Sequence, residues 1–249
     1  MASFCMKIAG AVAHVTCLFE STPLYFRAYV TEDEAQFSIS VSREDLIFEQ
    51  AELDAEAVQE GFRFRTFTDP FLERAAIQRA FAEFLFDRGV LLLHGSTVAV
   101  DGQAYLFTAR SGTGKSTHTR LWCQAFGSRA AIINDDKPFV AVTGEGVTAF
   151  GSPWSGKHGL DNNIAAPLAG ICFLERGQEN IIRPASREEV LPQLLKQGYC
   201  PLDEKKSQMY QQLMQLLVDK IPLWQMQCNK DISAAHTAFE AMCNKGETL

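Results

Sequence analysis

The 249-residue chain is 47% hydrophobic and 21% charged, ordinary values for a globular protein that can bury a sizeable core. Its formal net charge of −7 argues against a nucleic-acid partner or an anionic membrane surface, because the field of the chain repels phosphates at long range. No apolar run reaches the roughly 18 residues of a membrane span, and seven scattered cysteines without a C-x-x-C spacing favour free thiols and a cytoplasmic location.

The first region, residues 1–68, is predicted to be a small β-rich element. The segments KIAGAVAHVTCLF and AQFSISVS alternate or carry β-forming residues, which is typical of strands. The N-terminal segment is a poor secretion signal, because His14 interrupts its apolar run and only Lys7 precedes that run, so a strand is the better interpretation. The acidic segment 43–61 fits either a surface loop or a helix.

A helix is predicted to open the second region, residues 69–249. Asp69 is an N-cap candidate, Pro70 suits the first helical position, and Gly89 is placed to end the helix. The apolar residues between them fall on one face, and we expect that face to pack on the sheet that follows.

From residue 90 onwards, short β-rich runs bounded by Gly, Asp or Pro predict a series of strands. Only one helix-sized segment, residues 115–127, lies among the first three runs, which favours an α/β fold with a mixed or strongly bent sheet over regular βαβ alternation. Three helices are expected near the C-terminus, and the strand IPLWQMQC should separate the last two. The expected helices are residues 187–197, 203–219 and 232–243.

The most specific motif is a phosphate-binding loop. Residues 109–116, ARSGTGKS, fit the pattern G-x-x-x-x-G-K-[ST] with alanine at its first position. The strand AYLFT precedes the loop and the helix KSTHTRLWCQAFG follows it, so backbone N–H groups and the positive helix end should face one anion. The residues expected to bind the phosphates are Arg110, Ser111, Gly112, Thr113, Gly114, Lys115, Ser116 and Thr117.

The residue types of this loop each suit a phosphate site. Gly112 and Gly114 allow the backbone to approach phosphate oxygens closely. Lys115 supplies a point charge to the outer phosphates, and the Ser116 hydroxyl lies where Mg²⁺ would bind. Thr117 begins the helix and could contact the inner phosphate. The motif therefore predicts a nucleotide site.

Two carboxylates follow on the next predicted strand, RAAIIND. One helix, a turn and one strand fit between Lys115 and Asp135, so Asp135 and Asp136 should emerge at the same sheet edge as the loop. One of the two can hold Mg²⁺, and the other can accept a proton from an attacking hydroxyl.

Other classes of phosphate-loop protein fit less well. The NKD at residues 229–231 lacks the spacer of the guanine-specific N-K-x-D motif, and the sequence contains no L-S-G-G-Q signature of transporter ATPases.

The stretch from LLLHGSTVAV through the phosphate loop to AAIINDDKPFV, about residues 90–145, resembles the catalytic core of HPr kinase/phosphorylase. More distantly, it is similar to the nucleotide-binding part of ATP-dependent phosphoenolpyruvate carboxykinase.

This resemblance implies a fold and a chemistry. The fold would be a phosphoenolpyruvate-carboxykinase- and HPr-kinase-like phosphate-loop core on a mixed sheet. The chemistry would be phosphoryl transfer to a serine hydroxyl, with Asp135 as general base and Asp136 near Mg²⁺. The resemblance also favours an active-site role for His94, which is otherwise a histidine at the end of an apolar strand.

A second polar loop, GSPWSGKHGLDNN at residues 151–163, is a further candidate part of the site. Ser155, Lys157 and His158 could meet the γ-phosphate or the acceptor, and Trp154 could stack on a base or a peptide. Lys157 would add a cation as charge develops on the transferred group. Farther along, Glu175 and Arg176 could orient a substrate or simply close a hairpin.

Taken together, these features predict an ATP- and Mg²⁺-dependent kinase that transfers the γ-phosphate to a hydroxyl of a protein, a peptide or a small molecule. Its expected catalytic residues are His94, Lys115, Asp135 and Lys157, and its expected metal ligands are Ser116 and Asp136. Two alternatives stay open: a nucleotide-binding regulator without phosphotransfer, and a carboxykinase-like enzyme. GTP or pyrophosphate as donor, reverse phosphorolysis and a homo-oligomer also stay open.

Overall fold

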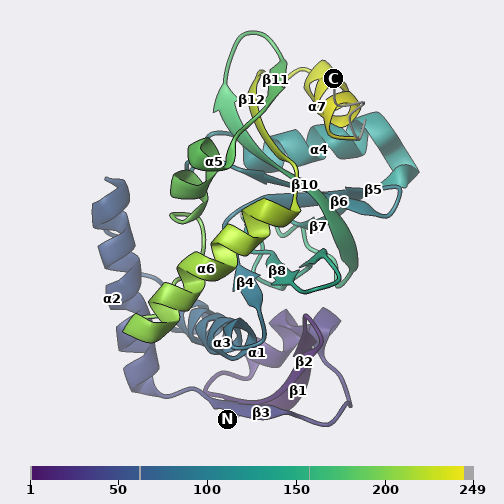
Figure 1. Cartoon of the computed structure of the whole chain (residues 1–249). Helices are drawn as coiled ribbons and strands as arrows, with labels where there is room; N and C mark the ends of the chain where they lie inside the picture. The colour runs from purple at the N-terminus through teal and green to yellow at the C-terminus, as the bar shows by residue number, and fades with distance from the viewer. Residues whose placement is uncertain (1, 62, 157, 244–249) are drawn as a thin grey trace. The chain divides into compact units, whose positions relative to one another are not determined.

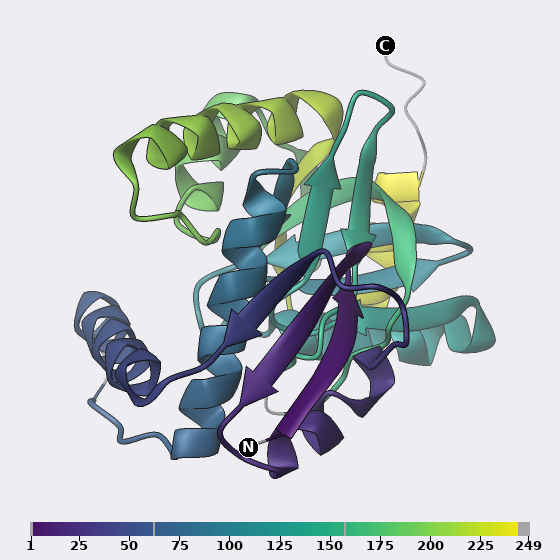
Figure 2. The same ribbon diagram turned by 90° about the horizontal axis from the view of Figure 1, so that it is seen from below.

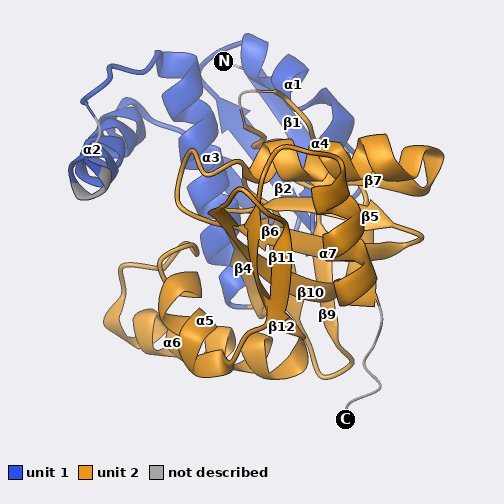
Figure 3. Ribbon diagram, turned by 90° about the horizontal axis from the view of Figure 1, so that it is seen from above, with its two compact units in different colours: residues 1–87 blue, residues 88–249 orange. Residues whose placement is uncertain are grey.

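The computed structural model describes residues 2–61, 63–156 and 158–243. Its contacts divide the chain into two compact units, Met1–Asp87 and Arg88–Leu249 (Figure 3). The division falls one helix later than the boundary expected after residue 68. None of the helices in the described part of the chain combines the length and hydropathy needed to cross a membrane. All seven cysteines, each within the described residues, are free thiols.

The first unit contains a three-stranded sheet in the order β1-β2-β3 (Figure 2). β1 (Ala2–Ile8) and β2 (Ala11–Cys17) form an antiparallel hairpin, and β3 (Phe37–Ser40) pairs in parallel with β2. Ala9 and Gly10, at φ of 48° and 83°, make the tight two-residue turn whose twist matches that of the strands. The N-terminal segment is therefore a strand, as expected.

The helices make the first unit a mixed α/β structure. They are α1 (Ser21–Tyr25), η1 (Arg27–Tyr29), α2 (Arg43–Glu60) and α3 (Asp69–Phe86). The ambiguous acidic segment forms α2, because Ser42 and Asp45 make a reciprocal capping box at its start. α3, whose N-cap is Thr68, packs against α2, α1 and β2, and Phe84 stacks on Phe37 of β3 with ring centroids 3.7 Å apart.

The second unit contains, within the described residues, one nine-stranded mixed sheet, which confirms the mixed and bent sheet expected from the sequence (Figure 1). The main path runs β4-β8-β9-β10-β6-β5-β7, and β12 and β11 extend it beside β10. The strands are β4 (Val90–Leu92), β5 (Ser96–Val100), β6 (Gln103–Thr108), β7 (Ala130–Asn134), β8 (Phe139–Val142), β9 (Val147–Phe150), β10 (Ala165–Arg176), β11 (Ile181–Pro184) and β12 (Leu223–Cys228).

The long strand β10 belongs to two parts of this sheet. Its first residues pair antiparallel with β9, and its last residues pair in parallel with β6 on one side and β12 on the other. The register shifts between Leu168 and Gly170, where one part gives way to the next. This change of partners along one strand accounts for the curl of the sheet.

The strand directions gather several chain segments at one edge. β6, β10 and β12 are parallel, and β7 is antiparallel to β5, which is itself antiparallel to β6. The carboxyl ends of β6, β7, β10 and β12 therefore open on the same edge. Ligands of open α/β sheets bind outside the carboxyl ends of strands, so this edge is where a site is expected.

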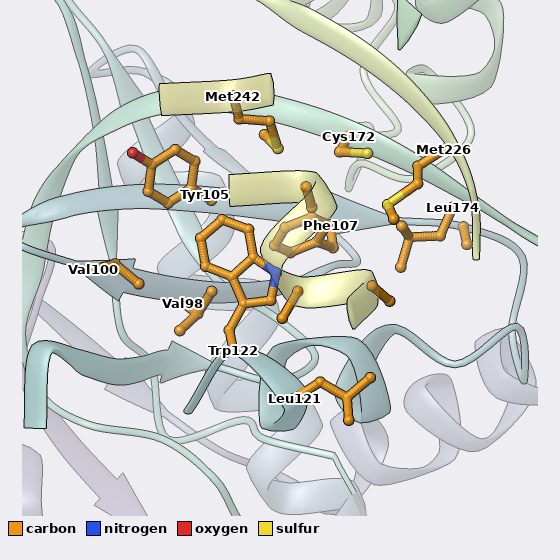
Figure 4. Packing of buried hydrophobic residues seen from close by; sticks show 14 residues of the cluster. Val98, Val100, Tyr105, Phe107, Leu121, Trp122, Cys172, Leu174, Met226 and Met242 are labelled. Carbon is orange, nitrogen blue, oxygen red and sulfur yellow. The ribbon is translucent and has the colours of Figure 1, made fainter. Parts of the chain in front are cut away.

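Helices complete the second unit. They are α4 (Lys115–Phe126), η2 (Gly127–Arg129), α5 (Arg187–Leu194), α6 (Glu204–Lys220) and α7 (Ser233–Cys243), which confirms the helices expected there. The fully buried ring of Trp122, a residue of α4, lies 4.9 Å from that of Tyr105 and 5.2 Å from that of Phe107, both on β6 (Figure 4). This core holds α4 against β5 and β6, and so fixes where α4 begins.

Candidate functional site

The phosphate-loop motif forms a strand–loop–helix turn at the edge described above. β6 ends at Thr108, α4 begins at Lys115, and the residues between them have no regular structure. Gly112 and Gly114 have φ of 77° and 124°, a backbone region that a residue with a Cβ enters only with strain. Gly114 is the N-cap of α4 and has no side chain to bond the first amides, so these N–H groups are available as donors for an anion.

Three hydrogen bonds fix the base of this loop and the start of α4. Lys115 is 7% exposed, and its Nζ donates to the carbonyl of Ala109, 3.2 Å away across the loop. The Ser116 hydroxyl donates to the backbone oxygen of Asp135 at 3.3 Å, which ties the start of α4 to the end of β7. Thr119 and Ser96 share a buried hydrogen bond of 2.7 Å between their hydroxyls. The cation and hydroxyl predicted to serve a nucleotide are thus in place beside the acidic pair.

The loop is also held from the opposite side, by Arg176 at the end of β10. Its guanidinium donates to the carbonyl oxygens of Gly112 and of Thr113, the latter at 3.3 Å. Both carbonyls are therefore turned toward β10. The sequence left Arg176 as either a substrate contact or a hairpin residue, and the structure places it on the phosphate loop.

Asn134 organises the acidic turn, a role that the sequence analysis missed. Its side-chain oxygen accepts hydrogen bonds from the backbone N–H of Asp136 at 2.8 Å and of Lys137 at 2.6 Å. Its amide donates to the backbone oxygen of Ser152 at 2.7 Å, and so joins this turn to the second polar loop. The available signal was the residue type, because asparagine side chains commonly bond the backbone two residues on.

Asp135 is a buried carboxylate at the end of β7. It is 2% exposed, and its Oδ1 accepts a hydrogen bond of 2.7 Å from the backbone N–H of Gly156. Its Oδ2 is also buried and has no hydrogen-bond partner among the described residues. Burial raises the pKa of Asp135 above the ordinary 3.8; the Gly156 bond opposes this shift and the neighbouring charge of Asp136 adds to it. A carboxylate in this state is a good proton acceptor.

The pKa of Asp136, the next residue, is shifted in the opposite direction. Burial alone would raise its pKa, but the hydrogen bond with His94 and the charges of Lys137 and Lys115 outweigh burial and lower the pKa of Asp136. The His94 Nε2 lies 3.4 Å from the Asp136 Oδ1. Burial is the largest cause that lowers the pKa of His94, although the Asp136 bond opposes it, so His94 is neutral at pH 7 and orients a charged Asp136.

The second polar loop contributes less than expected. Trp154 is 8% exposed and its ring packs edge-on to Phe139, with centroids 6.3 Å apart, so we assign it no stacking on a ligand. The Ser155 hydroxyl donates to the Asp161 carboxylate at 2.7 Å. His158 is exposed, and Lys157 lies outside the described residues. The loop's clearest contribution is the Gly156 N–H on Asp135.

The residues predicted to bind Mg²⁺ suit that ion. Ser116 supplies a hydroxyl and Asp136 a carboxylate of lowered pKa, both oxygen ligands of the kind that Mg²⁺ prefers. The described residues contain no group of three or more His, Cys, Asp or Glu side chains that could hold a metal ion on their own. Magnesium needs none, because it is usually bound by one or two carboxylates together with phosphate oxygens and water.

A pocket of about 260 Å³ opens beside the phosphate loop, and we call it the loop-side pocket. Its lining comes from the loop, the end of β10 and one residue of α5. The lining residues are Ala109, Arg110, Thr113, Phe173, Leu174, Glu175, Arg176 and Gln193. The sequence did not predict it, because it depends on the pairing of β10 with β6.

Comparisons with known proteins assign no family. No protein-family model matches the chain, and no curated protein matches it. Among solved structures, the chain is similar to the HPr(Ser) kinase/phosphatase from Coxiella burnetii, with 9% sequence identity and a TM-score of 0.36 over 61% of this chain and 99% of that one. A likeness of this size assigns no activity, so the mixed α/β fold and the site rest on this chain's own geometry.

Proposed function

We propose that the chain is a phosphotransferase that uses ATP and Mg²⁺ to phosphorylate a hydroxyl, on a serine of a protein or peptide or on a small molecule. The observation that supports this best is Asp135. Its carboxylate is buried and has one oxygen without a partner among the described residues, and its backbone oxygen accepts the hydrogen bond from Ser116 at the start of α4. A protein that only senses nucleotides needs a phosphate site and a metal ligand but no buried base.

The proposed roles follow the geometry. Lys115 and the loop amides would bind the β- and γ-phosphates, and Ser116 and Asp136 would hold Mg²⁺, which neutralises charge on those phosphates. Asp135 would take the proton of the acceptor hydroxyl. The freed oxygen bonds to the γ-phosphorus while the bond from that phosphorus to the β,γ-bridging oxygen breaks, and ADP leaves. His94 would hold Asp136 in place. Lys157, which lies outside the described residues, is proposed from the sequence alone to supply a cation to the transferred group.

The test is Asp135→Asn, which keeps the shape of the side chain and removes its basicity. We expect ATP turnover, measured as γ-phosphate released or transferred with labelled ATP, to fall by about 10²–10⁴-fold, the usual contribution of a general base. The affinity for Mg²⁺ and ATP should change little, because Asp135 contacts the hydroxyl and not the phosphates. Asp161→Asn, a nearby carboxylate outside the proposed chemistry, is the matched control and should retain turnover.

Either of two results would contradict the proposal. Asp135→Asn with undiminished turnover would remove the base from its role. Wild-type protein that binds ATP, yet neither hydrolyses it nor passes phosphate to any of a panel of hydroxyl compounds and serine peptides, would favour the nucleotide-binding regulator instead.

A further inference from the structure

The roles proposed above assign no ligand to the loop-side pocket. It nevertheless shares Ala109, Arg110 and Thr113 with the phosphate loop. At about 260 Å³ it falls just below the range of roughly 300–1,000 Å³ of pockets that hold whole small ligands. A pocket of this size beside an anion site suits one part of a larger molecule whose charged part lies on the loop.

The strand order gives the phosphate loop two flanks. β5 and β7, with Asp135 and Asp136 at the end of β7, lie on one side of β6, and β10 lies on the other. Under the proposed function the β7 flank holds the metal, the base and hence the acceptor hydroxyl. The β10 flank, where the loop-side pocket opens, is then the side that remains for the nucleoside end of the nucleotide.

The pocket lining combines two cations, Arg110 and Arg176, with one carboxylate, Glu175, and that carboxylate suits a neutral group with hydrogen-bond donors. Glu175 is exposed, and its carboxylate can only accept hydrogen bonds when it is ionised. The negative charge of Glu175 repels a polyphosphate nearby and so opposes binding of the ligand that carries it. A favourable contact with Glu175 must therefore come from uncharged hydrogen-bond donors of that ligand. The hydroxyls of a ribose are such donors, and carboxylates beyond the phosphate loop bind ribose hydroxyls in dinucleotide-binding folds.

Glu175 is held in position by a chain of hydrogen bonds across the strands. Gln225 of β12 donates to its Oε1 at 2.6 Å, and Gln225 in turn accepts a hydrogen bond from Arg183 of β11. Arg183 is fixed by two bonds to Glu189 of α5, at 2.8 and 3.2 Å. Gln225 and Arg183 line a neighbouring pocket that shares Glu175 with the loop-side pocket. A carboxylate offers about four acceptor positions, so the bond from Gln225 leaves Glu175 with capacity for a ligand.

We propose that the loop-side pocket receives the ribose of the nucleotide, and that Glu175 accepts hydrogen bonds from its 2′- and 3′-hydroxyls. This inference rests on the proposed function, because it takes a nucleoside triphosphate as the donor. Arg110 and Arg176 line the same pocket at the side of the loop, where the α-phosphate that joins ribose to the outer phosphates would pass.

The test measures dissociation constants by calorimetry, with Mg²⁺, for ATP, 2′,3′-dideoxy-ATP and inorganic tripolyphosphate. Wild-type protein should prefer ATP to dideoxy-ATP by about tenfold, the value of a hydrogen bond to a charged group. Glu175→Ala should bring that preference to within about twofold, and Glu175→Gln, which keeps an acceptor, should fall between. Tripolyphosphate should bind each variant as well as wild type, or slightly better, because a negative charge is removed.

Glu179→Ala is the control, because it removes a carboxylate from the turn between β10 and β11 that does not line the loop-side pocket. It should keep the full preference for ATP. Two results would overturn the inference: an unchanged preference for ATP in Glu175→Ala, or equal binding of ATP and dideoxy-ATP by wild type. In either case, binding of tripolyphosphate would show that the phosphate site itself is intact. Wild type that binds neither ATP nor tripolyphosphate would instead overturn the proposed function itself.

Discussion

The adjacent carboxylates of Asp135 and Asp136 lie in different environments, which shift their pKa values in opposite directions. Asp135 is buried against a single backbone donor, and its pKa is raised, whereas His94 and nearby lysines lower the pKa of Asp136. Pairs of titratable groups whose environments push their pKa values apart commonly divide the work of acid–base chemistry. Here one carboxylate is suited to accept a proton and the other to stay charged beside a metal.

This difference predicts a pH dependence of turnover. Because Asp135 must be ionised to accept a proton and its pKa is raised, kcat/KM should fall on the acid side at a pH above 3.8, the ordinary value. The charge of Asp161 contributes to that raised pKa, so Asp161→Asn should move the acid limb to lower pH. An acid limb at or below 3.8 would count against Asp135 as the base.

His118, on the buried side of α4, predicts a pH dependence of stability. It is 2% exposed, its Nε2 accepts a bond of 3.1 Å from the Trp122 ring nitrogen, and burial lowers its pKa to about 4 from the ordinary 6.5. Between pH 6.5 and 4, His118 is protonated in the unfolded chain and stays neutral in the folded chain. The free energy of unfolding should therefore decrease between pH 6.5 and 4, by up to about 3 kcal/mol.

The measurement is urea denaturation at several pH values across that window, on wild type and His118→Gln. Glutamine places an acceptor near the Trp122 N–H and does not titrate, so its stability should vary less with pH. Parallel pH profiles for the two proteins would show that His118 is not responsible.

Among the elements, the turn after β7 depends on a side chain rather than on its backbone alone. Asn134→Ala would leave the backbone N–H groups of Asp136 and Lys137 without their acceptor and break the bond to Ser152. We expect a loss of about 2–4 kcal/mol in the free energy of unfolding, measured by denaturant titration. Asn162→Ala removes one side-chain bond, to the carbonyl of Ile132, and should cost about 1 kcal/mol or less. Equal losses in the two variants would contradict this role.

The strand–loop–helix element could be predicted from the sequence because its determinants are local. The run AYLFT, the glycines at 112 and 114 and the following amphipathic segment all lie within one short stretch, and the structure has β6, the loop and α4 where they were expected. The sheet edge that the loop shares with Asp135 was also predictable, since one helix, one short turn and one strand connect the loop to Asp135.

The β10 side of the site could not be predicted in this way. The loop-side pocket and the Arg176 contacts require β10 to pair with β6 and β12, and Leu168 of β10 faces Ala104, far away in sequence. No local pattern specifies such a pairing. Trp154 shows the same limit in a single residue: its loop is polar and glycine-rich, but packing on Phe139 buries its ring.

At the scale of the whole molecule, the phosphate loop, the acidic turn and the loop-side pocket all belong to the unit Arg88–Leu249. A ligand that binds only the folded state stabilises it by about 2.7 kcal/mol at a concentration one hundred times its Kd. Mg²⁺ with ATP should therefore raise the melting temperature of this unit by roughly 5–10 °C in a thermal scan.

The control is Lys115→Ala, which should abolish most of the shift while leaving the unliganded transition recognisable. Hydrogen exchange with and without ATP separates the two units: protection should rise at residues 109–117 and not in Met1–Asp87. A shift that Lys115→Ala retains would place nucleotide binding elsewhere.

The bonds from Arg176 to the carbonyls of Gly112 and Thr113 have one more consequence. A loop already held in shape by a neighbouring strand loses little conformational freedom when an anion arrives, so the entropy of ordering is borne by folding and not by binding. Association should then proceed in a single kinetic step whose rate rises linearly with nucleotide concentration. Without the Arg176 guanidinium, the loop would have to become ordered each time a nucleotide binds.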